Sequence, residues 1–197
     1  MPFLCVSVDG IQVAAVSTDD LDVLTVNLSG AKIDEAFCHL QVSGGRYPPE
    51  AESTHLIWLN ELIVRPGQRV RFEMAALGLT SHSGKTIEEL FPEGIEERQG
   101  PFLSAEAVLD DLALRPQVRG AYRFSVKTSS GQGCTAETSV EEHGFGASFL
   151  WNSTRPDQVS ASLHSYSLQQ LRLRSGFIYH WREHLNTPSW AEATVEA

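Results

Sequence analysis

Near the end of the chain, two histidines and a glutamate have a spacing that can serve metal-dependent chemistry. His180 and His184 stand four positions apart, and Glu183 lies between them. On a helix, positions i and i+4 share one face, so both imidazoles can reach one zinc ion while the glutamate activates a water molecule. Two separate surface histidines are the other interpretation of the same letters.

The five residues His180-Trp181-Arg182-Glu183-His184 resemble the HxxEH motif of the inverzincin metallopeptidases. That resemblance implies a third zinc ligand, a glutamate from a helix far downstream. Here only 13 residues follow His184. The glutamates among them, Glu192 and Glu196, fall in a tail that is expected to fray. A metal-dependent hydrolase that uses this segment is therefore the alternative functional hypothesis and not the leading one.

A second stretch, Gly78–Thr86, has some features of a phosphate-binding loop, because it ends in Gly84-Lys85-Thr86 between a predicted strand and a predicted helix. A Walker A loop has four residues between its glycines, and this stretch has five. The preceding strand also alternates apolar with charged residues, whereas the strand before a P-loop is usually apolar on both faces. The pattern instead favours a helix that begins at an N-cap Thr86, with Glu89 completing a capping box.

Acidic residues gather in and after this predicted helix. The group that we single out as a candidate partner-binding surface is Glu88, Glu89, Glu93, Glu96 and Glu97. It lacks the spacing of a calcium-binding loop. Two interpretations remain: a solvated helix end followed by a linker, or a docking surface for arginines and lysines. Three aspartates would extend that surface if the fold brings them near, namely Asp19, Asp20 and Asp22.

Composition limits the partners and the compartment. The chain has 25 acidic and 15 basic residues and a formal net charge of −10, which disfavours nucleic-acid binding. Three scattered cysteines, Cys5, Cys38 and Cys134, form no CxxC pair and predict reduced thiols in the cytoplasm. No apolar run approaches the roughly 20 residues that span a membrane, and no basic segment precedes the apolar start. The sequence predicts no cofactor and leaves the oligomeric state open.

The elements that must position these residues are mostly strands. In the first half, β-rich runs that alternate or join at turns predict strands at Phe3–Val8, Ile11–Ser17, Val23–Ser29, Phe37–Val42, His55–Val64 and Arg69–Met74. Asp9-Gly10 predicts a tight hairpin turn between the first two. Ser43-Gly44-Gly45 is expected to end the fourth strand.

The second half is expected to begin with a helix capped by Ser104. Four strands follow, at Ala121–Lys127, Thr135–Val140, Phe145–Trp151 and Gln158–His164. After Ser167 the apolar spacing suits helices, interrupted at Ser175-Gly176. The fold class predicted is α+β and predominantly antiparallel β, with sandwich-like sheets and a few short helices. Proline and glycine around residue 98 divide the chain into a β-rich lobe, 1–98, and a smaller lobe, 99–197, unless both share one core.

From these observations the leading functional hypothesis is a non-enzymatic cytoplasmic interaction module, such as an inhibitor, immunity-type or adaptor protein. Its acidic surface would bind a basic protein partner. The alternative is the metal-dependent hydrolase described above, and no catalytic residue is assigned outside that alternative.

Overall fold

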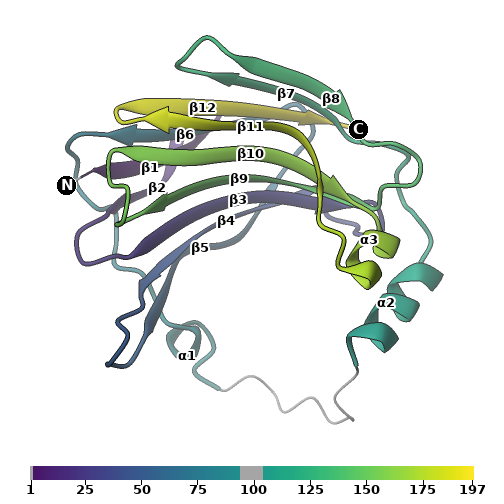
Figure 1. Ribbon diagram of the computed structural model, residues 1–197, viewed down its shortest axis with the longest axis horizontal. Coiled ribbons are helices and arrows are strands. Elements are labelled where there is room, and N and C mark those ends of the chain that lie inside the picture. Colours follow the sequence, from purple (N-terminus) through teal and green to yellow (C-terminus); the bar gives the residue numbers. More distant parts are fainter. Residues whose placement is uncertain (1, 94–103) are drawn as a thin grey trace.

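Two antiparallel sheets of six strands each form the body of the protein, which confirms the predicted fold class (Figure 1). The computed structural model describes residues 2–93 and 104–197. In the order of their pairing, the strands of sheet A are β2 (Ile11–Ser17), β1 (Phe3–Val8), β6 (Arg69–Ala75), β12 (Ser189–Glu196), β7 (Arg123–Thr128) and β8 (Gly133–Glu137). Those of sheet B are β11 (Ile178–Asn186), β10 (Gln158–Tyr166), β9 (Gly144–Asn152), β3 (Val23–Ala31), β4 (Cys38–Arg46) and β5 (Thr54–Val64).

The two sheets face each other across one apolar core to which both predicted lobes contribute. Each sheet has three neighbouring strands from before residue 98 and three from after it. The two sets join where β6 pairs with β12 in sheet A and where β3 pairs with β9 in sheet B. Alternating strand residues point inward, and the aromatic rings of Phe145, Phe149 and Trp151 are almost completely buried, as is Tyr122 just before β7. Phe72 of sheet A meets Phe149 of sheet B with ring centroids 5.7 Å apart. This contact shows how side chains of the two inner faces interdigitate.

The described residues form three short helices outside the sheets: α1 (Ile87–Leu90), α2 (Ala105–Leu114) and α3 (Leu168–Leu173). In Figure 1 they lie below the strands, on the side away from β7, β8 and β12. The predicted caps are confirmed, because Thr86 and Glu89 form a capping box at α1 and the Ser104 hydroxyl accepts the Ala107 N–H at α2. None of the helices among the described residues is both long enough and apolar enough to cross a membrane.

Two local predictions were wrong. β4 does not end at Ser43-Gly44-Gly45 but runs through it to Arg46. The glycines are needed there because a Cβ on Gly44 would lie 2.5 Å from the carbonyl oxygen of Val23 on the neighbouring strand. The residues after 177 are also not helical. They form β11, an edge strand of sheet B, and β12, which lies between β6 and β7 in sheet A.

A segment that we call the strap, residues 76–86, closes one side of the sandwich by joining the edge strands β2 and β5. Ser81 exchanges backbone and side-chain hydrogen bonds with Ala15 of β2. Four residues later, Lys85 and Ile57 of β5 form a two-way backbone bridge. Covering both edges in this way removes exposed backbone groups that would otherwise pair with another chain. The loop that resembles a P-loop therefore serves as a covering segment.

Burial of Cys38 leads to a prediction about alkaline stability. This thiol is fully buried in the core, and burial raises its pKa to about 12, against a smaller opposing effect of Arg119. A folded-state pKa above the unfolded value means that the folded state retains the proton, so stability is lost as pH rises from about 9 towards 12. We expect a slope of up to about 1.4 kcal/mol per pH unit from this one group.

Urea titrations at several pH values between neutrality and strongly alkaline conditions will measure that slope. Cys38→Ala is expected to flatten the pH dependence, although it lowers stability at neutral pH by leaving a small cavity. Cys134→Ala is the matched control, because this partly exposed thiol should contribute less. Equal slopes in the wild type and the Cys38→Ala protein would contradict the prediction.

Candidate functional site

A groove of about 410 Å³ opens between β2 and β5, next to the strap. Its walls come from four separate parts of the chain: the end of β2, the turn after it, the first half of β5 and the strap. The residues that line it are Val16, Ser17, Asp19, Asp20, Leu21, Arg46, Thr54, Leu56, Trp58, Thr80, Ser83 and Gly84. No sequence pattern indicated this site, because the parts of its wall are up to about seventy residues apart and only the packing of the two sheets brings them together.

The floor of the groove is apolar and firmly built. Trp58 and Leu21 are more than nine-tenths buried. The strap passes so close over the indole that a Cβ on Gly84 would lie 2.9 Å from Trp58. His82 of the strap bonds the Trp58 carbonyl oxygen through Nε2 at 2.7 Å. The floor is therefore preformed, which lowers the ordering cost of binding a side chain there.

The rim of the groove is acidic. Asp19 and Asp20 are exposed, and neither forms an ion pair with another described residue, although the Ser17 hydroxyl donates to Asp19 at 2.8 Å. Arg46 is the one basic residue of the lining, so the rim carries a net negative charge. Asp22 instead stabilises the fold, because its carboxylate accepts a hydrogen bond from the Tyr47 N–H at 2.6 Å. Two of the three aspartates considered in the sequence thus lie at the groove.

The predicted acidic group continues from the strap. Glu88 and Glu89 belong to the first turn of α1, and both side chains and that of Glu93 are exposed. Hydrogen bonds at the helix start, first with the backbone and then with Thr86, lower the pKa of Glu88, so it stays ionised well below neutral pH. Glu89 has a structural task, because it accepts the Thr86 N–H in the capping box. The remaining two predicted residues, Glu96 and Glu97, lie outside the described residues.

The histidine pair does not have the geometry that the sequence pattern suggested. Residues 180–184 belong to strand β11, which has a bulge opposite Leu163 and His164. His180 points between the sheets, where its Nε2 lies 2.8 Å from the hydroxyl of the fully buried Ser165.

His184 lies on the other side of the same strand. It lines a polar pocket of about 280 Å³ together with Ser160 and Arg155. Glu183 faces inward and accepts a hydrogen bond from Thr128 of sheet A. The helix on which the shared zinc site depended is absent from this segment, so the two imidazoles have no common face. Among the described residues, no cluster of three potential metal-ligating side chains occurs.

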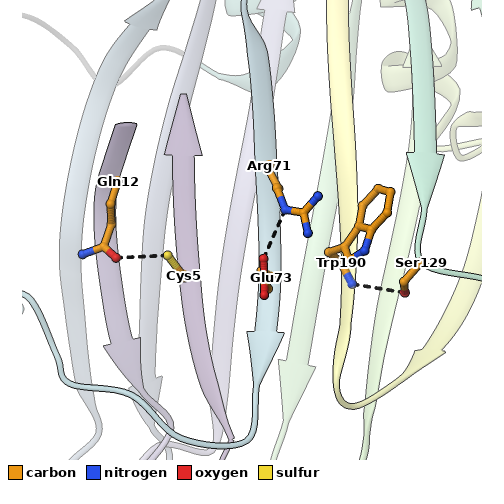
Figure 2. A network of polar contacts seen from close by, with 6 residues as sticks. All are labelled: Cys5, Gln12, Arg71, Glu73, Ser129 and Trp190. Carbon is orange, nitrogen blue, oxygen red and sulfur yellow. Dashed lines mark hydrogen bonds and ion pairs between the residues drawn. The ribbon is translucent and has the colours of Figure 1, made fainter. Parts of the chain in front are cut away.

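The outer face of sheet A is polar, and several of its side chains pair with one another (Figure 2). Cys5 donates to Gln12 on the neighbouring strand, and Arg71 donates to Glu73 at 3.1 Å. The Arg71 guanidinium also lies 4.2 Å from the ring centroid of Trp190. Burial and the charge of Glu73 raise the pKa of the Cys5 thiol, which keeps it protonated and unreactive near neutral pH.

The architecture defines the protein as a two-sheet antiparallel β-sandwich with an acidic groove at one side and short helices outside the sheets. No family model matches the chain, and no curated protein and no solved structure matches it significantly.

Proposed function

We propose that this protein is a non-enzymatic interaction module of the cytoplasm, of the inhibitor, immunity-type or adaptor kind, which binds a basic segment of a protein partner. The observation that supports it best is the groove between β2 and β5, where an apolar floor lies beneath two exposed carboxylates. An arginine or lysine side chain has the complementary structure, with an apolar stem and a cationic head. Its stem would pack on Leu56 and Trp58 while its head meets Asp19 and Asp20.

The overall charge supports the same class of partner. With ten more acidic than basic residues, the field around the protein attracts basic chains and repels acidic ones. Glu88 in α1 and Glu93 just after it follow the strap that forms one wall of the groove, so they would steer a basic segment towards it. Electrostatic steering mainly accelerates association and is screened by salt.

A fluorescent arginine-rich peptide is a suitable probe, with a glutamate-rich peptide of the same length as its counterpart. We expect the arginine-rich peptide to bind and its affinity to fall steeply as salt is raised, while the glutamate-rich peptide does not bind. Replacing both rim aspartates, in the variant Asp19→Asn/Asp20→Asn, should weaken binding by about tenfold, which corresponds to about 1.4 kcal/mol. Fluorescence anisotropy measures both effects.

The matched control is Glu141→Gln/Glu196→Gln. Both glutamates are exposed and without an ion pair among the described residues. Glu141 lies in the turn before β9 and Glu196 at the end of β12, and neither lines the groove. This variant has the same net charge as the double aspartate variant. If the two variants lose affinity equally, the peptide responds to net charge alone and the groove is not its site. Binding that ignores salt would contradict the electrostatic mechanism.

A further inference from the structure

The outer face of sheet B differs from the rest of the surface because it carries no carboxylate over five adjacent strands. Along β4, β3, β9, β10 and β11, the side chains that point away from the core are hydroxyls, amides, imidazoles, tyrosines, a few apolar groups and one arginine, Arg182. All these positions belong to the described residues. On a protein of net charge −10, so large an uncharged area is a distinct chemical surface.

Strand register places the polar groups of this face in rows that cross the sheet. One row consists of Gln41, Asn27, Ser148, Ser162 and Arg182, because each of these residues is paired with the next on the neighbouring strand. Neighbouring strands are about 4.8 Å apart, so the row presents a donor or acceptor at that interval. A linear chain of sugar rings presents hydroxyl groups at a comparable repeat.

The polar groups of this row are free to bind. The side chains of Gln41, Asn27, Ser148 and Ser162 form no hydrogen bond with any other described residue, and each is half-buried. On the outer face of sheet A, by contrast, Cys5 bonds Gln12 and Arg71 bonds Glu73 (Figure 2). Amides and hydroxyls both donate and accept, which suits a ligand whose hydroxyls also do both.

The adjacent row contains two imidazoles whose Nδ1 atoms are enclosed and out of reach of a surface ligand. His39 and His164 each have a buried Nδ1 atom without a hydrogen-bond partner among the described residues. Gly146 lies in the same row, beside His164, and a Cβ there would come within 2.7 Å of the His164 ring. Burial, with Arg182 and His180 nearby, lowers the pKa of His164, so this ring is neutral at physiological pH and the face stays largely uncharged.

Exposed aromatic rings border the face at β11. Phe177 and Tyr179 are 43% and 47% exposed, which leaves about half of each ring open to a ligand. His164 packs against both, with ring centroids 4.5 Å from Phe177 and 5.6 Å from Tyr179, and the Arg182 guanidinium lies 3.8 Å from the Tyr179 centroid. The rings are held in place by these contacts, and flat apolar surfaces of this kind stack on the C–H faces of sugars.

The polar pocket of about 280 Å³ lies at one end of the same face, where Asn152, Gln158, Ser160 and His184 surround it.

We propose that the outer face of sheet B binds a neutral oligosaccharide, whose rings lie along the polar rows and stack at Phe177 and Tyr179. Neutral sugars fit the face because it has many uncharged donors and acceptors, aromatic rings at its border and very little charge. This site is separate from the acidic groove, so either proposal can fail without the other.

Isothermal titration calorimetry with maltohexaose, cellohexaose and mannohexaose tests the proposal. We expect at least one of them to bind with a dissociation constant in the micromolar to millimolar range, without the steep salt dependence of a charged ligand. Heparin hexasaccharide and a single-stranded oligonucleotide are the anionic probes. Binding of only the anionic probes, or of none of the five, would overturn the proposal.

Variants locate the binding site. Asn27→Ala/Gln41→Ala and Tyr179→Ala should each weaken binding by about tenfold or more, equivalent to about 1.4 kcal/mol. Ser148→Arg should abolish it by placing a long side chain across the central row. Gln12→Ala, on the outer face of sheet A, is the control and should leave binding unchanged. All variants are first checked for the wild-type unfolding transition, and equal affinity in the wild type and every sheet B variant would exclude this face.

Discussion

Replacing Tyr122 with alanine is expected to lower the free energy of unfolding by more than about 3 kcal/mol. The Tyr122 ring is fully buried and packs against three phenylalanines, with ring centroids 5.3 Å from Phe37, 6.4 Å from Phe124 and 4.7 Å from Phe145. Loss of the ring leaves a cavity between the sheets that these neighbours fill only in part. Urea unfolding followed by tryptophan fluorescence measures the change.

The Tyr122 hydroxyl makes a second, smaller contribution. It lies 3.0 Å from the carbonyl oxygens of both Ala31 and Phe37, and it accepts a hydrogen bond from Arg119. These bonds hold the β3–β4 connection against the entry to β7. Tyr122→Phe keeps the ring and removes only the hydroxyl, so it should cost about 1–2 kcal/mol. If the phenylalanine variant is as unstable as the alanine variant, the hydrogen bonds and not the ring packing dominate this site.

Removing either member of a buried pair of opposite charges, Lys32 and Glu142, is expected to cost about 3 kcal/mol or more. Lys32 is fully buried and Glu142 is 5% exposed. They are linked through one residue, because the Lys32 ammonium donates to the Ser139 carbonyl oxygen at 2.6 Å and Glu142 accepts the Ser139 N–H at 2.7 Å. Burial lowers the pKa of Lys32, while the carboxylates of Glu142 and Glu137 oppose that shift. The carboxylate of Glu142 thus offsets part of the effect of burial on the Lys32 charge, through Ser139 and without a direct ion pair.

A double-mutant cycle with Lys32→Met and Glu142→Gln tests this dependence. Each single variant leaves one buried charge without its counterpart, whereas the double variant leaves none. We expect the double variant to be more stable than the sum of the single changes predicts, by at least about 1 kcal/mol. Additive effects would show that the two charges are stabilised independently. The exposed pair Arg123–Glu137, with N and O atoms 3.3 Å apart, is the control and should show little coupling.

Ligand affinity at the two proposed sites is expected to depend differently on salt concentration, so one experiment can distinguish the sites. A basic segment at Asp19 and Asp20 should be released by salt, because both carboxylates are exposed to screening ions. A neutral oligosaccharide on sheet B should remain bound under the same conditions. One titration series at low and high ionic strength with both kinds of probe therefore reports on both sites.

Local patterns were sufficient to locate most of the strands and the helix caps. The hairpin of β1 and β2 was predicted with its correct bounds from the residue types Asp9 and Gly10. In the structure both adopt the positive φ angles, 51° and 81°, that such a turn requires. Thr86 and Glu89 were identified as a capping box from their spacing alone. These features depend on interactions between residues that are close in the sequence, so the amino-acid order contains the information directly.

Long-range packing decided the rest. Residues 180–184 have a spacing compatible with a helix, but pairing with β10 makes them a strand and places His180 and His184 in different environments. The glycines of β4 resemble a turn until the close approach of β3 explains them. The groove and the polar rows of sheet B combine residues that are distant along the chain. Such sites depend on which strands become neighbours, and hydrophobic alternation specifies the buried face of a strand without specifying its partner.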